Sequence, residues 1–179
     1  MWRVARAPLV WLATLLLLFS AMPSVAAGID APFTLTPPTD LQAAPVARAA
    51  SGNTYAYLPA DLKQALRLMI TAMPAGEIRH RLGPLSDAQC IRLFLDELRK
   101  DHQHFFAVDM TAPLAVGAAS FRRVRWTGDK GGRALTGVLS CGELAGNYYV
   151  VHYTDTIDRA SSSFPAIRAS LQSLTPSTE

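Results

Sequence analysis

The stretch from Arg133 to Thr156 constrains the fold of this chain more than any other segment. It contains two runs of β-forming residues, separated by Ala145-Gly146-Asn147. Alternate residues of a strand share a face, so Leu139 and Cys141 would point to the same side of the first run. Strand-like runs on both sides of a short turn that contains glycine are typical of a β-hairpin. We therefore expect an antiparallel hairpin here.

Two more strands are predicted directly before this hairpin. His104–Thr111 and Ser120–Thr127 both have period-two patterning, and the small residues Pro113–Ala119 between them indicate a loop or a bulged edge. The glycine-rich stretch 128–132 provides the turn into the hairpin, because glycine adopts positive φ without strain. Four consecutive strands with short turns favour an antiparallel meander.

Three segments have apolar residues at helical spacing: Pro59–Met73, Ser86–Gln103 and Ser163–Leu174. Ser86 and Gln89 form a capping-box pattern at the start of the second helix. Ser163 is expected to cap the last helix, with Pro165 in its first turn. Glu77–Leu85 fits either a short helical turn or a connector.

These elements predict a single α+β domain over residues 51–179. It would consist of a four-stranded, mainly antiparallel sheet, packed by two N-terminal helices and one C-terminal helix. Residues 28–50 are rich in alanine and proline and lack an apolar period. Because proline joins neither helix interiors nor central strands, we expect a flexible leader there.

The N-terminus has the order of a secretory signal peptide. Two arginines precede an apolar run over Ala7–Met22, and Val25-Ala26-Ala27 fits a cleavage site near Ala27. A permanent membrane span is the alternative, but the run is shorter than the roughly 20 apolar residues that a span needs. We therefore expect signal peptide removal over residues 1–27 and a periplasmic or secreted protein that is not an integral membrane protein after cleavage.

The chain has only two cysteines, Cys90 and Cys141. In an oxidising compartment, two cysteines in one small domain are expected to form a disulfide; two separate buried thiols are the alternative. Cys90 lies on the flank of the second helix, so the bond would join that helix to the third of the four strands. Neither cysteine belongs to a CxxC motif, which argues against redox catalysis and zinc binding.

Charge and motifs exclude several function classes. Removing Arg3 and Arg6 with the signal peptide leaves fifteen basic residues against fourteen acidic ones, so the net charge falls from +3 to about +1. Such a balance gives no reason to expect a nucleic-acid partner. Phosphate loops and dinucleotide fingerprints are absent from the sequence, and we predict no cofactor.

The last third of the chain carries a resemblance to a known family. Gly137-Val138-Leu139, Tyr148–Thr154 and Phe164–Leu174 together give strand, turn, strand and closing helix. This pattern resembles small bacterial envelope proteins with the PsbP-like α/β/α sandwich fold. The resemblance implies a non-catalytic envelope or interaction role. That family shares no catalytic motif, so no site residue is carried over from it.

The first candidate site is the basic, aromatic-bearing stretch Arg122, Arg123, Arg125 and Trp126. Strand alternation places Arg123 and Arg125 on one face, and Arg122 and Trp126 on the other. Such a surface could hold an anionic envelope component or an acidic protein. The alternative is a solvated outer face whose arginine stems cover apolar area.

Histidines suggest two further kinds of site. His102 and His104 resemble a metal-binding His-x-His pair, but they straddle a helix-to-strand junction and lack a third ligand in register, so we predict no metal. His152, Asp155 and Ser161–Ser163 supply the residue types of a hydrolytic triad. However, the chain has no G-x-S-x-G elbow, and serines before a helix are ordinarily caps.

From these observations we expect an exported protein that acts by binding another envelope component or protein, including neutralisation of a toxin-type effector, rather than by catalysis. The binding residues would be Arg122, Arg123, Arg125 and Trp126, with His152 on the same outer surface. One alternative is a small secreted hydrolase that uses His152. The other is a structural factor in assembly of the cell envelope.

Overall fold

The computed structural model describes residues 31–49, 52–117 and 119–177. The expected signal peptide over residues 1–27 lies outside these ranges. Within them, no helix is both long enough and apolar enough to cross a membrane.

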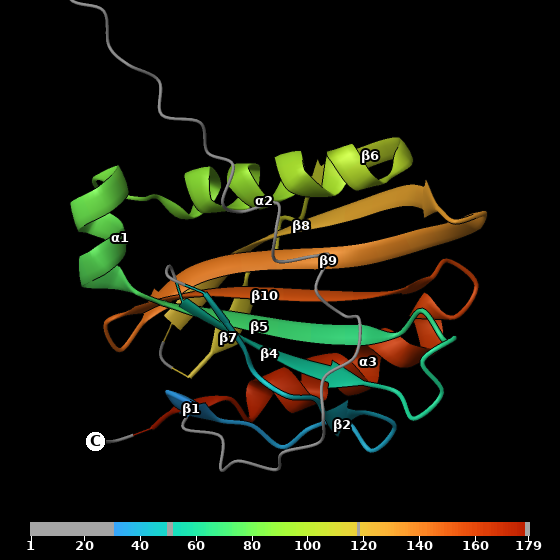
Figure 1. The fold of residues 1–179 in the computed structure, drawn as a ribbon, viewed down its shortest axis with the longest axis horizontal. Coiled ribbons are helices and arrows are strands. Elements are labelled where there is room, and N and C mark those ends of the chain that lie inside the picture. Colours follow the sequence, from blue (N-terminus) through green and yellow to red (C-terminus); the bar gives the residue numbers. More distant parts are fainter. Residues whose placement is uncertain (1–30, 50–51, 118, 178–179) are drawn as a thin grey trace, which may run out of the picture.

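The described elements are eleven strands and three helices (Figure 1). The strands are β1 Phe33–Thr34, β2 Gln42–Ala43, β3 Ala47–Ala49, β4 Gly52–Leu58, β5 Arg67–Pro74, β6 Gln103–Asp109, β7 Leu114–Val116, β8 Ala119–Lys130, β9 Arg133–Leu144, β10 Asn147–Thr156 and β11 Thr175–Pro176. The helices are α1 Ala75–Leu82, α2 Asp87–Asp101 and α3 Ala160–Gln172.

One antiparallel sheet of nine strands forms the centre of the domain. Its main path runs β2-β4-β5-β10-β9-β8-β6, with β3 beside β4 and β7 beside β8. The predicted meander β6-β8-β9-β10 is confirmed, but the predicted sheet of four strands is wrong, because the sheet continues past β10 through β5 and β4. Figure 1 shows α2 on one side of this bent sheet and α3 on the other.

The error in sheet size comes from Pro59–Met73, which was expected to be a helix. Residues 67–74 instead form β5, which lies between β4 and β10. Its buried residues Leu68, Ile70 and Ala72 follow period two. Met69 and Met73 lie on the other face. In the sequence, these methionines and the apolar residues before them are spaced as in a helix, which is why a helix was predicted. A central strand is apolar on both faces, and periodicity alone does not separate such a run from a buried helix.

The helices agree with the sequence in part. The predicted capping box of α2 is confirmed, since the Ser86 hydroxyl accepts from the Gln89 amide and the Gln89 side chain accepts from the Ser86 amide. The ambiguous segment Glu77–Leu85 contains most of α1. The start predicted for α3 at Ser163 is wrong, because the helix begins at Ala160 and places Pro165 inside it.

The two faces of the sheet carry separate apolar cores. The core on the α2 face contains Met73, Ala75, Ile78, Cys90, Ile91, Val124, Leu139, Cys141, Tyr148 and Val150. The larger core on the α3 face includes Phe33, Leu41, Tyr55, Leu68, Ile70, Phe121, Val138, Tyr149, Val151, Tyr153, Phe164, Ile167 and Leu171. Alternate residues of β9 and β10 therefore enter different cores.

The predicted disulfide is confirmed. Cys90 of α2 and Cys141 of β9 are bonded, and both are buried in the core on the α2 face. The bond closes a loop with a sequence separation of 51 residues. In the chain-entropy model such closure stabilises the folded state by about 4 kcal/mol.

Residues 31–49 were expected to belong to a flexible leader, but the structure places them against the domain. Phe33 and Leu41 are buried in the core on the α3 face. β1 pairs with β11, while β2 and β3 pair with β4. The prolines lie between these short strands and outside the ladders, which is why a proline-rich segment can still dock on an edge.

Two glycines of β9 make room for aromatic rings of β8. A methyl group on Gly142 would lie 2.0 Å from the ring of Phe121, and one on Gly137 would lie 2.6 Å from the indole of Trp126. We expect Gly142→Ala and Gly137→Ala each to lower the free energy of unfolding by about 1–3 kcal/mol, because both overpack a filled core. Chemical denaturation measures this loss.

Gly76→Ala is the matched control for these two variants. Gly76 lies in α1, and a methyl group there would meet no atom within 4 Å. Alanine is also the better helix former, so its unfolding free energy should stay equal or rise slightly. Equal losses at Gly76 and Gly142 would contradict the packing argument.

Candidate functional site

The predicted basic stretch divides between the two faces of the sheet, as the alternation of β8 requires. Trp126 pairs across the sheet with Gly137 and packs on the α2 face, where Arg122 forms an ion pair with Asp109 at 2.6 Å. Arg123 and Arg125 pair with Ser140 and Val138 and lie on the α3 face. The five predicted binding residues therefore do not form one surface.

His152 belongs to the α2 face, although it was expected on an outer surface beside the arginines. The indole nitrogen of Trp126 donates a hydrogen bond to its Nε2 at 3.1 Å. Because Nε2 accepts this bond, the neutral ring carries its proton on Nδ1. Burial, and to a lesser extent the nearby His102, lower the pKa of His152 to about 4. This histidine is therefore a neutral packing group at ordinary pH.

The two histidines of the His-x-His pattern have different hydrogen-bond partners and do not form a pair. The Nδ1 of His102 donates to the carbonyl of Leu98 at 2.7 Å, and its ring packs on Trp126. His104 is exposed and its Nδ1 lies 2.8 Å from the carboxylate of Asp129. Within the described part of the chain, no three metal-ligating side chains gather at one point.

The residue types of the hydrolytic triad are not brought together. His152 lies against Trp126 on the α2 face, whereas Ser161 belongs to α3 on the opposite side of the sheet. The hydroxyl of Ser162 donates to the carbonyl of Arg159 at 2.8 Å, which is a local bond within the first turn of α3. Among the described residues proposed for the triad, no serine therefore lies in contact with His152.

What the fold does assemble is a cavity of about 370 Å³ between the sheet and α3. Its lining comes from β8, β9, β10, α3 and the segments beside them: Met110, Arg123, Arg125, Thr127, Thr136, Val138, Tyr153, Ile157, Ala160, Ser161, Phe164, Pro165 and Arg168. This volume lies in the range of small-molecule sites, roughly 300–1,000 Å³. We call it the arginine cavity.

Arg123 is the anchored cation of the arginine cavity. It is only 8% exposed, and both Nε and a terminal nitrogen donate to the carbonyl of Ala112. A guanidinium has five N–H donors in a rigid fork, so these bonds orient it and leave further donors. The segment before β7 thus holds one positive charge at a fixed place in the wall.

The phenol of Tyr153 lies within the field of three arginines. Burial raises the pKa of Tyr153, and the charges of Arg123, Arg168 and Arg125 oppose this rise. These three cations come from β8 and α3, which are far apart in sequence, and converge on one side chain. The cavity therefore combines a positive potential with a hydroxyl that can donate a hydrogen bond.

The cavity lining itself contains only positive charge; the buried carboxylate nearest to it, Asp155, lies in the rim and faces Arg159. No aspartate or glutamate lines the cavity. Arg125 and Arg168 form no hydrogen bond or ion pair with any group in the described ranges, whereas Arg79, Arg81, Arg99, Arg122 and Arg159 each lie within 4.0 Å of a carboxylate. A concave wall with unpaired guanidinium groups and apolar flanks is suited to an anion.

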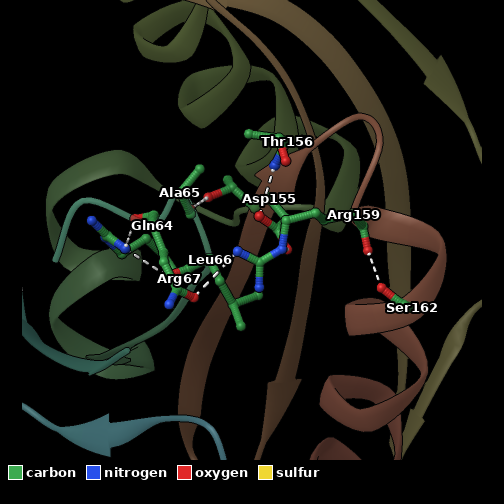
Figure 2. Close-up of polar contacts among 9 residues, drawn as sticks. Gln64, Ala65, Leu66, Arg67, Asp155, Thr156, Arg159 and Ser162 are labelled. Atoms are coloured by element: carbon green, nitrogen blue, oxygen red, sulfur yellow. Dashed lines mark hydrogen bonds and ion pairs between the residues drawn. The ribbon is translucent and has the colours of Figure 1, made fainter. Parts of the chain in front are cut away.

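The turn between β10 and α3 forms one rim of the cavity, and buried polar contacts hold it in place (Figure 2). The carboxylate of Asp155 is fully buried, accepts from the Thr156 amide at 2.8 Å and lies 3.8 Å from Nε of Arg159. The amide of Ile157 donates to the carbonyl of Ala134 on β9. The rim residue Ile157 is therefore held against β9 by its own backbone bond, in a turn that the buried Asp155 also fixes.

Sequence reasoning identified Arg123 and Arg125 but missed Arg168 and Tyr153 as parts of the same site. Arg168 follows Phe164 by one helical turn, which places both on one side of α3. That spacing was a usable signal. The missing information was the side of the sheet on which α3 packs, and only the tertiary structure supplies it.

Comparisons with known proteins show the fold. No protein-family model matches the sequence, and no curated protein matches it. The structure is similar to that of LpqN, described as involved in cell envelope biogenesis of Mycobacterium tuberculosis, with a TM-score of 0.51 and 16% identity over 80% of this chain and 83% of LpqN.

Two other solved structures are similar. One is from Bacteroides thetaiotaomicron, with a TM-score of 0.51 and 14% identity; the match covers 83% of this chain and 46% of that one. The other is a cyanobacterial PsbP from Synechocystis, with a TM-score of 0.49 and 10% identity over 86% of this chain and 98% of that one. The similarity to LpqN covers 80% of this chain, so the structural resemblance extends well beyond its last third.

Acidification should weaken the fold through His152. Its pKa is about 4 in the folded protein against 6.5 when free, so the unfolded chain binds more protons between these values. The free energy of unfolding should therefore fall as pH drops through this window, by up to about 3 kcal/mol. Urea titrations at a series of pH values measure the loss.

Two variants test the assignment of this pH dependence. His152→Gln removes the titrating group and should flatten the curve between pH 6.5 and pH 4, whereas His80→Gln, at an exposed position of α1, should leave it unchanged. A wild-type slope in His152→Gln would show that another group is responsible.

Proposed function

We propose that this protein is an extracytoplasmic binding protein that holds an anionic group in the arginine cavity and catalyses no reaction. The observation that carries the proposal is the charge of the cavity lining: among the described residues, Arg123, Arg125 and Arg168 line it and no carboxylate does. Buried or recessed guanidinium groups are stabilised when an anion pairs with them.

The compartment is supported by two features. The chain contains a disulfide between Cys90 and Cys141, and such bonds persist in oxidising compartments. Its N-terminus has the charge and apolar order of a signal peptide. The similarity to LpqN, described as involved in cell envelope biogenesis, is consistent with an envelope role for this chain as well.

Binding accounts for the cavity better than hydrolysis does. No histidine, aspartate, glutamate or cysteine lines the cavity, so it lacks a side chain that could act as a general base near neutral pH. His152, the base of the alternative hydrolase hypothesis, lies on the other face of the sheet and is bonded to Trp126. A hollow of this volume also suits a small molecule or head group better than the flatter patch of a protein interface.

The proposal predicts which arginines sense an anion. Titration of the ¹⁵N-labelled protein with inorganic phosphate should shift the Nε–Hε signals of Arg125 and Arg168 in a saturable manner. Arg125→Gln combined with Arg168→Gln should weaken phosphate binding by at least about tenfold, because each charge-assisted hydrogen bond is worth about 1.5–3 kcal/mol.

Arg122→Gln is the matched control, because it removes an arginine of the same strand from the opposite face. It should leave the phosphate titration unchanged. Shifts spread evenly over all arginines, or equal weakening in Arg122→Gln, would contradict a specific site in the cavity.

A further inference from the structure

An exposed apolar stripe runs along β6 beside the arginine cavity. Phe106 is 65% exposed and Val108 is 51% exposed, although both lie in a regular strand. In the ladder between β6 and β8, Phe106 pairs with Thr127 and Val108 pairs with Arg125. Directly paired residues of an antiparallel ladder point to the same face, about 4.5–5.5 Å apart at Cβ. The stripe and the cavity wall are therefore neighbours on one face.

The stripe leads into the cavity. Met110 follows Phe106 and Val108 at the next alternate position and lines the cavity itself. Met110 directly follows the end of β6 at Asp109, and the strand rises roughly 3.3 Å per residue up to that point. Ala107, on the other face of β6, pairs with Trp126 and packs against the core beneath α2. The two apolar side chains of β6 that are more than half exposed therefore lie on one face.

The opposite rim of the cavity is also apolar and exposed. Ile157, in the turn between β10 and α3, is 51% exposed and lines the cavity. Within the described ranges, five large apolar side chains are more than half exposed. Of these, Ile157 lines the opening, and Phe106 and Val108 are paired with residues that line it. Exposed apolar side chains that gather at one opening, rather than being scattered singly, favour a binding surface.

We infer that the ligand of the arginine cavity is a single-chain amphiphile, with an acidic head group held by the arginines and an acyl chain lying along Phe106 and Val108. The inference rests on the proposed function, since it assumes that the cavity holds an anion. It adds the second half of the ligand: an apolar chain that leaves the cavity through its apolar mouth and covers the stripe.

Other occupants fit these observations less well. A small inorganic anion would pair with the arginines but leave the apolar stripe exposed. A neutral lipid would cover the stripe but bring no charge to Arg123, Arg125 and Arg168. The surface of a bilayer is flat, whereas Arg123 is 8% exposed and lies in the wall of a hollow. A single amphiphile outside a bilayer would both pair with the arginines and cover the exposed apolar stripe.

Chain length is the variable that tests this inference. Isothermal titration of the purified protein with acetate, octanoate, decanoate and dodecanoate, each below its micelle concentration, should give affinities that rise with length. We expect about twofold per added methylene, which is roughly half the effect of complete burial. The glycerol monoester of dodecanoate, which is neutral, should bind at least about tenfold more weakly than dodecanoate.

Substitutions on the stripe should change the contribution of the acyl chain to the affinity without changing that of the head group. Phe106→Thr with Val108→Thr keeps β-forming residues in the edge strand and should remove the dependence on chain length, leaving inorganic phosphate binding unchanged. Leu62→Thr replaces another exposed apolar residue, 65% exposed and outside the cavity lining, and should behave as the wild type.

The outcomes distinguish the two proposals. Phosphate binding with alkanoate affinities that do not depend on length would overturn the amphiphile inference and leave the anion site standing. Failure of phosphate and every alkanoate to bind would overturn both. Lysophosphatidylglycerol, compared with dodecanoate, distinguishes a phospholipid source from a free fatty acid. Sedimentation with phosphatidylglycerol vesicles, without binding to any dispersed amphiphile, would show bilayer docking instead and overturn the inference.

Discussion

The alternation of side chains along β8, β9 and β10 is the constraint on which the rest of the structure depends. It directs Val124, Leu139 and Cys141 to a core beneath α2, and Phe121, Val138 and Tyr153 to a larger core beneath α3. A shift of one residue in register would exchange the two sets and carry Cys141 away from Cys90. The disulfide, both helices and the arginine cavity therefore share one register.

The same constraint explains why basic residues of one strand have different roles. Arg122 lies on the α2 face, pairs with Asp109 and is a surface ion pair of small energetic value. Arg123 and Arg125 face the other way, where α3 adds Arg168 and no carboxylate lines the space between them. Whether an arginine of β8 is solvated or available for binding thus depends on the face of the sheet to which it points and on whether a carboxylate lies beside it.

The edge strand β6 places an exposed apolar stripe next to the arginine cavity. β6 is the last strand of the main path, so one of its edges pairs with no strand in the described part of the chain. An exposed edge with a flat apolar stripe is a liability for a folded protein, which natural proteins usually blunt with charge or cover. A ligand chain lying over Phe106 and Val108 would provide that cover while its head group pairs with the arginines.

The sequence by itself determined the meander β6-β8-β9-β10, the capping box of α2, the Cys90–Cys141 disulfide and the division of Arg122 from Arg123 and Arg125. Each depends on local signals: period two, a capping pair, or the only two cysteines. Only the tertiary structure decided that 67–74 is a central strand, that His152 is bonded to Trp126, and that Arg168 and Tyr153 join the arginines. Those outcomes depend on which face α3 covers and on strand pairing between distant segments, and local periodicity carries no information about either.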